Sequence, residues 1–409
     1  MINSAFSIFS KKAINYRRFL LFYAFFIFGY ISLSAFFLHE KENMYNYTYY
    51  FLDYELGFIK RAFLGELFDY LGLRENYTIF KIALIFKNIL VMFLFVWLVA
   101  KPYVANKQKT ANFLFILFAI SHSLTLSSIL YDFGHIEHFN FLIVFSLMLL
   151  VNSIGVYYGG LFSVFLLPIM CLVHEAAAIM FLPTFYAFFI YNSKKINNIF
   201  NYYLFFLYII VFFISVCIAF CFGFSDYQLL VKHTSNNVGD FFTPNTNALG
   251  FLTNNIEDNI MIVLKHTFTF KRLFHHLLFA PMAILTLYVF WKINGFSRRN
   301  PKEMFLFLSC LSPLLLYLIG HDHFRWWSIA VINLFIVTSL LAAKPENNEA
   351  FTNRLFEIRH SIIALIVMSL ILGSPRVYKG FLIGEQFLNF LNSLSQSSIL
   401  QTIFPSLSP

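Results

Sequence analysis

Charge is the scarcest property of this sequence. Only 12% of the 409 residues are Asp, Glu, Lys or Arg, 59% are hydrophobic, and the mean hydropathy is +0.70. Soluble domains carry about 25% charged residues, so an ordinary soluble enzyme is excluded. A disordered chain is excluded as well, because such chains are poor in aromatic residues and this one has 57 Phe and 23 Tyr.

Cysteines are few, and several catalytic motifs are missing. Cys171, Cys217, Cys221 and Cys310 all lie in apolar runs, which favours small buried side chains over a disulfide framework or a zinc site. The sequence has no glycine-rich phosphate loop, no nucleophile-elbow serine, no H-E-x-x-H and no C-x-x-C. It therefore carries no nucleotide-binding or common hydrolase signature.

The net charge of +9 does not indicate a nucleic-acid partner. The longest basic clusters are pairs, such as Lys11-Lys12 and Arg298-Arg299, whereas a nucleic-acid surface needs many Lys and Arg on one soluble face. Basic pairs at the ends of apolar runs are typical of the cytoplasmic side of a membrane protein.

Long apolar runs predict an all-α, polytopic integral membrane protein. They fall at 19–38, 82–100, 111–130, 139–158, 160–173, 176–191, 200–222, 277–291, 304–320, 326–343 and 360–374. At about 20 residues a span, they predict about 11 transmembrane helices (10–12) in a single polytopic domain, 1–409. A first outer loop is predicted at 39–81 and a long outer loop at 223–275.

Basic and acidic residues predict the orientation. Lys and Arg are denser in the segments placed inside by a cytoplasmic N-terminus, as the positive-inside rule requires. Of the 20 Asp and Glu residues, only Glu303, Glu346, Glu349 and Glu357 fall on that side. Titratable chemistry is therefore expected on the outer face.

The first outer loop contains the first candidate site. Leu56, Ile59, Phe63, Leu67 and Tyr70 or Leu71 recur at helical spacing, which predicts an interfacial helix. Asp53 and Glu55 stand at its N-terminal edge, where a helix dipole favours anions. Asp53 is interpreted either as a helix cap or as a base that deprotonates a sugar hydroxyl, and Arg61 lies near it in the sequence.

Three more groups of polar residues fall on the predicted outer face. His135 and His138, beside Asp132 and Glu137, are spaced to share a helix face as metal ligands can, or belong to a solvated loop. His174 and Glu175 interrupt an apolar stretch, where charge is costly, or form a loop tip. The third group contains His321, Asp322, Arg325, Trp326 and Trp327.

Arg325 is predicted to start a span, where it can clamp a diphosphate with two hydrogen bonds. Trp326 and Trp327 are interpreted as interface anchors or as rings that stack on a sugar. The alternative is an aromatic belt with a snorkelling arginine, but that reading does not explain His321 and Asp322.

A first span followed by a loop with an early carboxylate and an interfacial helix resembles the GT-C class of membrane glycosyltransferases. Asp53-Tyr54-Glu55 matches the place where that class puts its catalytic carboxylate. The apolar chain also resembles bacterial O-antigen polymerases, which join lipid-linked units on the periplasmic side. It departs from them in having one long outer loop instead of two and a predicted outer C-terminus.

The resemblance implies a glycosyltransferase or polymerase in the bacterial inner membrane, with its functional face in the periplasm. Its expected partners are polyprenyl-diphosphate-linked saccharides, membrane lipids and other polysaccharide-assembly proteins, and the product is O-antigen or another surface polysaccharide. No cofactor and no metal-ligand set is assigned, and a divalent metal ion is left open. We predict the catalytic residues to be Asp53, Glu55, His174 and Glu175, and the substrate-binding residues to be Arg61, His135, His138, His321, Asp322, Arg325 and Trp326.

Two alternatives remain. A flippase for the same lipid-linked units needs charged groups at the midplane and access from both faces, whereas the ionisable residues here gather on one predicted face. A membrane acyltransferase is expected to have a deep histidine within a span. His122 is the one such residue, and we interpret it as a satisfied core histidine.

Overall fold

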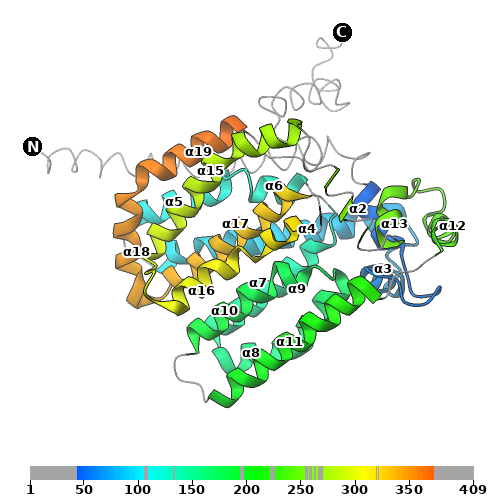
Figure 1. The fold of residues 1–409 in the computed structure, drawn as a ribbon, viewed down its shortest axis with the longest axis horizontal. Helices are drawn as coiled ribbons and strands as arrows, with labels where there is room; N and C mark the ends of the chain where they lie inside the picture. Colours follow the sequence, from blue (N-terminus) through cyan, green and yellow to red (C-terminus); the bar gives the residue numbers. More distant parts are fainter. Residues whose placement is uncertain are drawn as a thin grey trace, which may run out of the picture. The chain divides into compact units, whose positions relative to one another are not determined.

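The computed structural model describes residues 44–105, 109–131, 134–193, 198–221, 226–253, 257, 260–261, 264–265, 270–318, 320 and 322–372. Within these ranges every regular element is a helix (Figure 1), which confirms the predicted all-α class. The described residues belong to one unit of the chain, Glu40–Ile383. The predicted first span at 19–38 lies outside the described residues.

Helices occupy each predicted apolar run that falls within the described residues. They are α4 (Tyr77–Ala105), α5 (Lys109–Ser121), α6 (Leu126–Tyr131), α7 (Glu137–Ser153), α8 (Val156–Val173), α9 (Ala177–Met180), α10 (Leu182–Asn192), α11 (Asn198–Cys221), α15 (Phe270–Asn294), α16 (Pro301–Cys310), η2 (Ser312–Leu318), α17 (His323–Ala342) and α19 (Arg359–Leu372). The polar helix α18 (Pro345–Glu357) joins α17 to α19.

Four of these helices are long and apolar enough to cross a membrane. They are α4, α8, α15 and α17, and the bent pair α16 and η2 makes a fifth if it is counted as one span. Shorter apolar segments also occur in α5, α7, α9 with α10, α11 and α19. Several helices can therefore span a membrane, and the total of about eleven spans remains a prediction.

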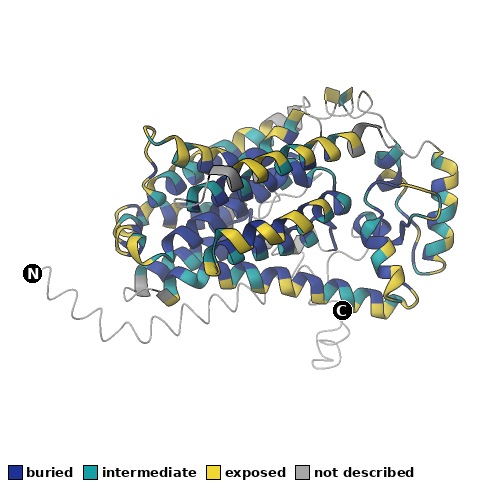
Figure 2. Cartoon of the chain, turned by 90° about the horizontal axis from the view of Figure 1, so that it is seen from below, coloured by how far each residue is buried: buried dark blue, intermediate teal, exposed yellow. Residues whose placement is uncertain are grey.

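Helix α17 is the centre of the helical layer (Figure 1). In its most apolar stretch 89% of the residues are buried, whereas the corresponding stretches of α4, α8 and α15 are 39–44% buried. Figure 2 shows the same contrast, with buried residues inside and exposed residues along the outer helices. A helix buried all round belongs to a protein core.

The exposed side of α4 is apolar. Ile82, Phe86, Ile89, Phe93 and Trp97 are all exposed and recur every three or four residues, which places them on one face of the helix. A soluble monomer rarely leaves so large an apolar stripe in water. A lipid-facing surface explains the stripe.

Short elements gather at one end of the long helices: α2 (Met44–Thr48), η1 (Tyr49–Phe51), α3 (Phe63–Tyr70), α12 (Tyr227–Val238) and α13 (Thr246–Thr253) (Figure 1). They come from the two predicted outer loops, 39–81 and 223–275. Tyr47, Tyr49, Tyr50, Phe51 and Phe80 are buried together with Leu249 and Leu252 of α13. An aromatic core therefore binds these two loops together.

The helix of the first loop is shorter than the sequence pattern predicts. It begins at Phe63 rather than near Leu56, because Gly57 and Arg61 have φ values of +95° and +65°, which an α-helix does not accommodate. Its buried residues include Leu64 and Phe68, whereas Tyr70 and Leu71 are exposed. The predicted stripe is thus displaced, and a position of α3 on the membrane surface remains a prediction.

Candidate functional site

Asp53 follows the fully buried turn η1 and is itself 2% exposed. The backbone there is fixed by a close crossing, since a Cβ at Gly65 of α3 would lie 1.8 Å from the Leu52 carbonyl oxygen. Only glycine fits at this crossing. The sequence therefore holds the Asp53 backbone firmly between η1 and α3.

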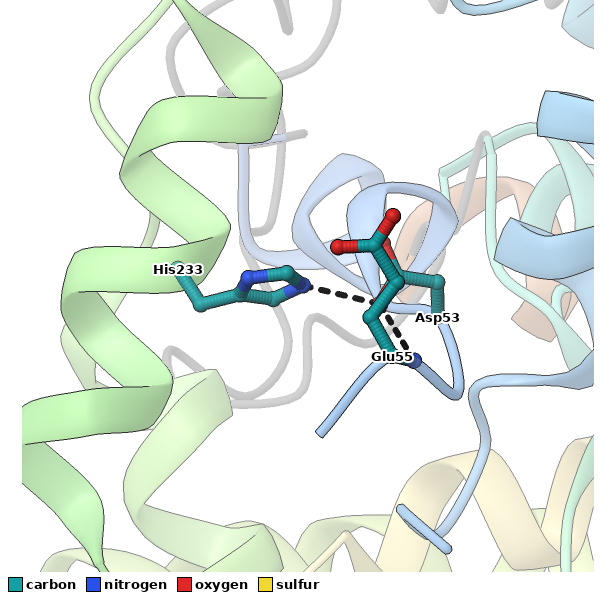
Figure 3. Close-up of side chains that lie close together, drawn as sticks. All are labelled: Asp53, Glu55 and His233. Carbon is teal, nitrogen blue, oxygen red and sulfur yellow. Dashed lines mark hydrogen bonds and ion pairs between the residues drawn. The ribbon is translucent and has the colours of Figure 1, made fainter. Parts of the chain in front are cut away.

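Side chains of helix α12 contact the Asp53 carboxylate, and Figure 3 shows one of them, His233. His233 Nε2 lies 2.8 Å from Asp53 Oδ1, and Asn237 Nδ2 donates to Asp53 Oδ2 at 2.6 Å. His233 and Asn237 are four residues apart, so both project from one face of α12. Asn237 also donates to the Phe51 carbonyl oxygen at 3.1 Å. The two predicted outer loops therefore meet at this carboxylate.

Two more charged side chains complete the group that we call the Asp53 site, which consists of Asp53, Glu55, Arg74, His233 and Asn237. Glu55 is exposed, and its backbone N–H donates to Asp53 Oδ1 at 3.2 Å. Arg74 Nη1 lies 3.5 Å from Asp53 Oδ2, and Arg74 Nη2 lies 2.6 Å from Asp69. Asp53 is not the cap of α3, because Ala62 occupies that position and no side chain caps the helix.

Arg61 and Glu175 form an ion pair between segments 114 residues apart. Arg61 Nε donates to both Glu175 oxygens, at 3.1 and 3.2 Å, and Arg61 Nη1 donates to the Tyr49 hydroxyl at 3.2 Å. Burial alone would raise the pKa of Glu175, but the Arg61 charge outweighs it and holds that pKa well below its usual range. Arg61 is the one non-glycine residue with positive φ in the described part of the chain. A positive φ strains the backbone of a non-glycine residue, and strained backbone conformations cluster at functional sites.

Arg325 anchors a second pair at the start of α17. Its Nη2 lies 2.6 Å from Asp322 Oδ2, and its Nη1 lies 2.7 Å from His135 Nε2. Because an arginine only donates, His135 Nε2 accepts from Arg325, and the Glu137 backbone N–H donates to His135 Nδ1 at 3.3 Å. That atom faces Glu137 Oε2 at 3.6 Å. Burial, followed by the Arg325 charge, lowers the pKa of His135 well below its usual value, so this histidine is neutral.

His174 and Glu137 lie between the Arg61–Glu175 pair and the Arg325–Asp322 pair and connect them. His174 Nδ1 accepts from the Ala176 N–H at 3.1 Å, so its proton is on Nε2, which lies 3.2 Å from Glu137 Oε1. Arg325 Nε approaches the other Glu137 oxygen at 3.6 Å. We call this set the buried charge network, and it consists of Arg61, His135, Glu137, His174, Glu175, Asp322 and Arg325.

A buried lysine of α4 touches the edge of this network. Lys87 Nζ donates to the His135 carbonyl oxygen at 2.9 Å and to the Tyr50 hydroxyl at 2.7 Å. In the next position, Asn88 Oδ1 lies 3.1 Å from His138 Nδ1. His138 is buried and turned toward α4. Within the described residues, His135 and His138 do not belong to a group of three metal-ligating side chains.

Trp326 lies within the protein. It is 4% exposed, and its ring packs against Tyr317 at 5.5 Å and His323 at 5.6 Å between centroids. A Cβ at Gly320 would lie 2.7 Å from this ring, so glycine is required there. His321 lies outside the described residues.

Six predicted site residues come together in the buried charge network: Arg61, His135, His174, Glu175, Asp322 and Arg325. Asp53 and Glu55 belong to the separate Asp53 site, where sequence reasoning did not select His233, Asn237 or Arg74. A usable signal existed for His233 and Asn237, because they stand four residues apart on one face of a helix. Lys87 was not selected either, although a charge within the apolar run 82–100 is a signal for a special role.

The described fold is that of an all-helical protein with several helices able to span a membrane and two polar sites built from its loops and helix ends. No protein-family model, no curated protein and no solved structure matches this chain.

Proposed function

We propose that this protein is a membrane glycosyltransferase that joins polyprenyl-diphosphate-linked saccharide units during synthesis of a surface polysaccharide. The observation that carries the proposal is the Asp53 carboxylate, which is hydrogen-bonded to His233 at 2.8 Å and to Asn237 at 2.6 Å. Asp53 and Glu55 come from the first predicted outer loop, and α12 comes from the other one. This arrangement gives a carboxylate a fixed position, as a general base requires.

The proposed reaction moves a saccharide from one lipid carrier to an acceptor sugar. The acceptor oxygen forms a bond to the anomeric carbon of the donor, and the bond from that carbon to the diphosphate oxygen breaks. The hydroxyl proton passes to a carboxylate of the Asp53–Glu55 pair. The polyprenyl diphosphate leaves with the electron pair of the broken bond.

Arg61 and Arg325 are proposed to stabilise the charge that develops on the diphosphate. Preorganised donors act best where charge develops, and both guanidinium groups are held in place, by Glu175 and by Asp322. Arg61 Nη1 and Nη2 each carry two N–H groups. The network therefore fixes the orientation of Arg61 without using all of its donors.

This proposal places the protein in the bacterial inner membrane, with the Asp53 site and the buried charge network facing the periplasm. The apolar stripe on α4 supports a membrane location. Membrane lipids and other polysaccharide-assembly proteins are the expected neighbours.

The test is gel analysis of the surface glycan in a deletion strain that carries wild type, Asp53→Asn or Arg325→Lys. We expect both variants to lose the polymer ladder and leave the core with a single repeat unit, at unchanged protein level. Asp240→Asn is the matched control, because Asp240 is exposed and follows α12 directly. An unchanged ladder in the deletion strain would overturn the proposal and favour a transporter.

A further inference from the structure

We propose that Asp53, Glu55 and His233 bind a divalent cation of the Mg²⁺ or Mn²⁺ class. One ligand atom from each of these three residues lies within 4.8 Å of the other two. Figure 3 shows the His233 imidazole of α12 directed toward the segment that carries Asp53 and Glu55. Asp53 is buried and Glu55 is exposed, so the group lies at the boundary between the protein interior and its surroundings.

The types of ligand indicate the class of metal. Carboxylate oxygens are typical ligands of Mg²⁺ and Mn²⁺. Mn²⁺ is a first-row transition metal, and such metals also bind the imidazole of histidine. Three protein ligands leave an octahedral ion three open positions for water or substrate oxygens. A closed structural site would instead supply four protein ligands.

The surroundings of the ligands are already ordered as in metal sites, where outer hydrogen bonds orient the ligating groups. Asn237 Nδ2 holds Asp53 Oδ2 at 2.6 Å and is itself fixed by the Phe51 carbonyl oxygen at 3.1 Å. The Glu55 N–H holds Asp53 Oδ1 at 3.2 Å. The central carboxylate therefore has a defined orientation.

The local charge favours a cation. Arg74 Nη1 pairs with Asp53 at 3.5 Å, but Arg74 Nη2 lies closer to Asp69, at 2.6 Å. Asp53 and Asp69 thus share Arg74, and the exposed Glu55 carboxylate beside Asp53 adds a further negative charge. The remaining negative charge is what a divalent cation would neutralise.

Arg74 provides an independent observation. It is 9% exposed, and its Nη1, which faces Asp53, has no hydrogen-bond partner among the described residues. A buried donor without an acceptor is costly. Arg74 Nη1 can therefore donate a hydrogen bond to one more acceptor at this site. A substrate oxygen coordinated to the same cation would satisfy this donor.

The proposal rests on the ligand geometry and does not depend on the proposed glycosyltransferase activity. If both hold, a bound cation lowers the pKa of a coordinated hydroxyl beside the carboxylates that accept its proton.

Metal binding is measured directly by electron paramagnetic resonance, with Mn²⁺ titrated into the purified full chain in detergent micelles. We expect wild type to bind one Mn²⁺ that an excess of Mg²⁺ displaces. Glu55→Gln and His233→Gln should each weaken Mn²⁺ binding by about tenfold or more. Asp240→Asn should bind as wild type does.

The variants separate coordination from folding and from simple hydrogen bonding. Glu55 is exposed, so Glu55→Gln should keep the elution profile of the folded protein. Glutamine at position 233 can still donate to Asp53 but cannot replace the imidazole ligand. Absent Mn²⁺ binding in wild type, or wild-type binding in both variants, would leave a hydrogen-bonded Asp53–His233 pair and overturn the metal site. The polymer ladder is a separate readout, so the two proposals can fail independently.

Discussion

Removing one side of the Arg61–Glu175 pair should destabilise the protein more than removing both. A buried arginine or glutamate left without its partner costs about 3–5 kcal/mol, whereas replacing a whole buried pair by apolar residues is often nearly neutral. Here the side chains retain 17% and 13% exposure, and Arg61 keeps the Tyr49 hydroxyl at 3.2 Å and the Tyr49 ring at 5.4 Å. We therefore expect the lower end of that range, about 3 kcal/mol, for Glu175→Leu.

The assay is a double-mutant cycle on the free energy of unfolding in detergent micelles, followed by tryptophan fluorescence. Arg61→Met and Glu175→Leu are the single variants. We expect Arg61→Met to cost a similar amount, because Glu175 is then left without its cation, and the double variant to cost about 1 kcal/mol. A loss in the double variant equal to the sum of the single losses would show that the two residues do not act as a pair and would refute the reasoning.

Two further predictions follow from the same region. Gly65→Ala should destabilise the protein by about 1–3 kcal/mol, because the new methyl group meets the Leu52 backbone. It should also reduce any activity that depends on Asp53. The control is Gly250→Ala, also in a helix, whose new methyl group meets nothing within 4 Å and which should be neutral or stabilising in the same unfolding assay. Since Arg61 and His174 hold the Glu175 pKa below its ordinary value of about 4.3, the contribution of Glu175 is present above that pH and is lost as the pH falls. Unfolding free energies measured from about pH 6 to 3 should thus decline less steeply in Glu175→Gln than in wild type, and equal slopes would contradict this assignment.

Hydrophobic patterning was enough to locate the apolar helices but not their interruptions, nor the polar helices α12, α13 and α18. The predicted run 111–130 is split between α5 and α6 around His122. His122 Nδ1 accepts from the Leu124 N–H, and Thr125 Oγ1 donates to the His122 carbonyl oxygen at 2.8 Å. Such local side-chain bonds satisfy the backbone without a continuous helix, and mean hydropathy does not register them. The other His122 nitrogen lies 3.1 Å from Thr286 Oγ1, which agrees with its interpretation as a satisfied core histidine.

The site residues were partly predictable, because charge in an apolar chain is costly and marks places with a special role. This reasoning selected His174 and Glu175, whereas Arg61 was selected for its place in the first outer loop and Arg325 for its place at the start of a span. None of these arguments indicated the partners. Arg61 and Glu175 are 114 residues apart, and Asp53 and His233 are 180 apart. Pairing over such separations depends on how the helices pack, which a periodic pattern in one segment does not contain.

The most direct test of the proposed function is a reaction with purified components. The full chain is reconstituted in liposomes with a polyprenyl-diphosphate-linked saccharide, and released polyprenyl diphosphate and elongated glycan are measured by mass spectrometry. We expect both products with wild type and with Asp240→Asn, and neither product with Asp53→Asn. If wild type instead moves the intact lipid-linked unit across the bilayer and forms no glycosidic bond, the glycosyltransferase is contradicted and the protein is a flippase.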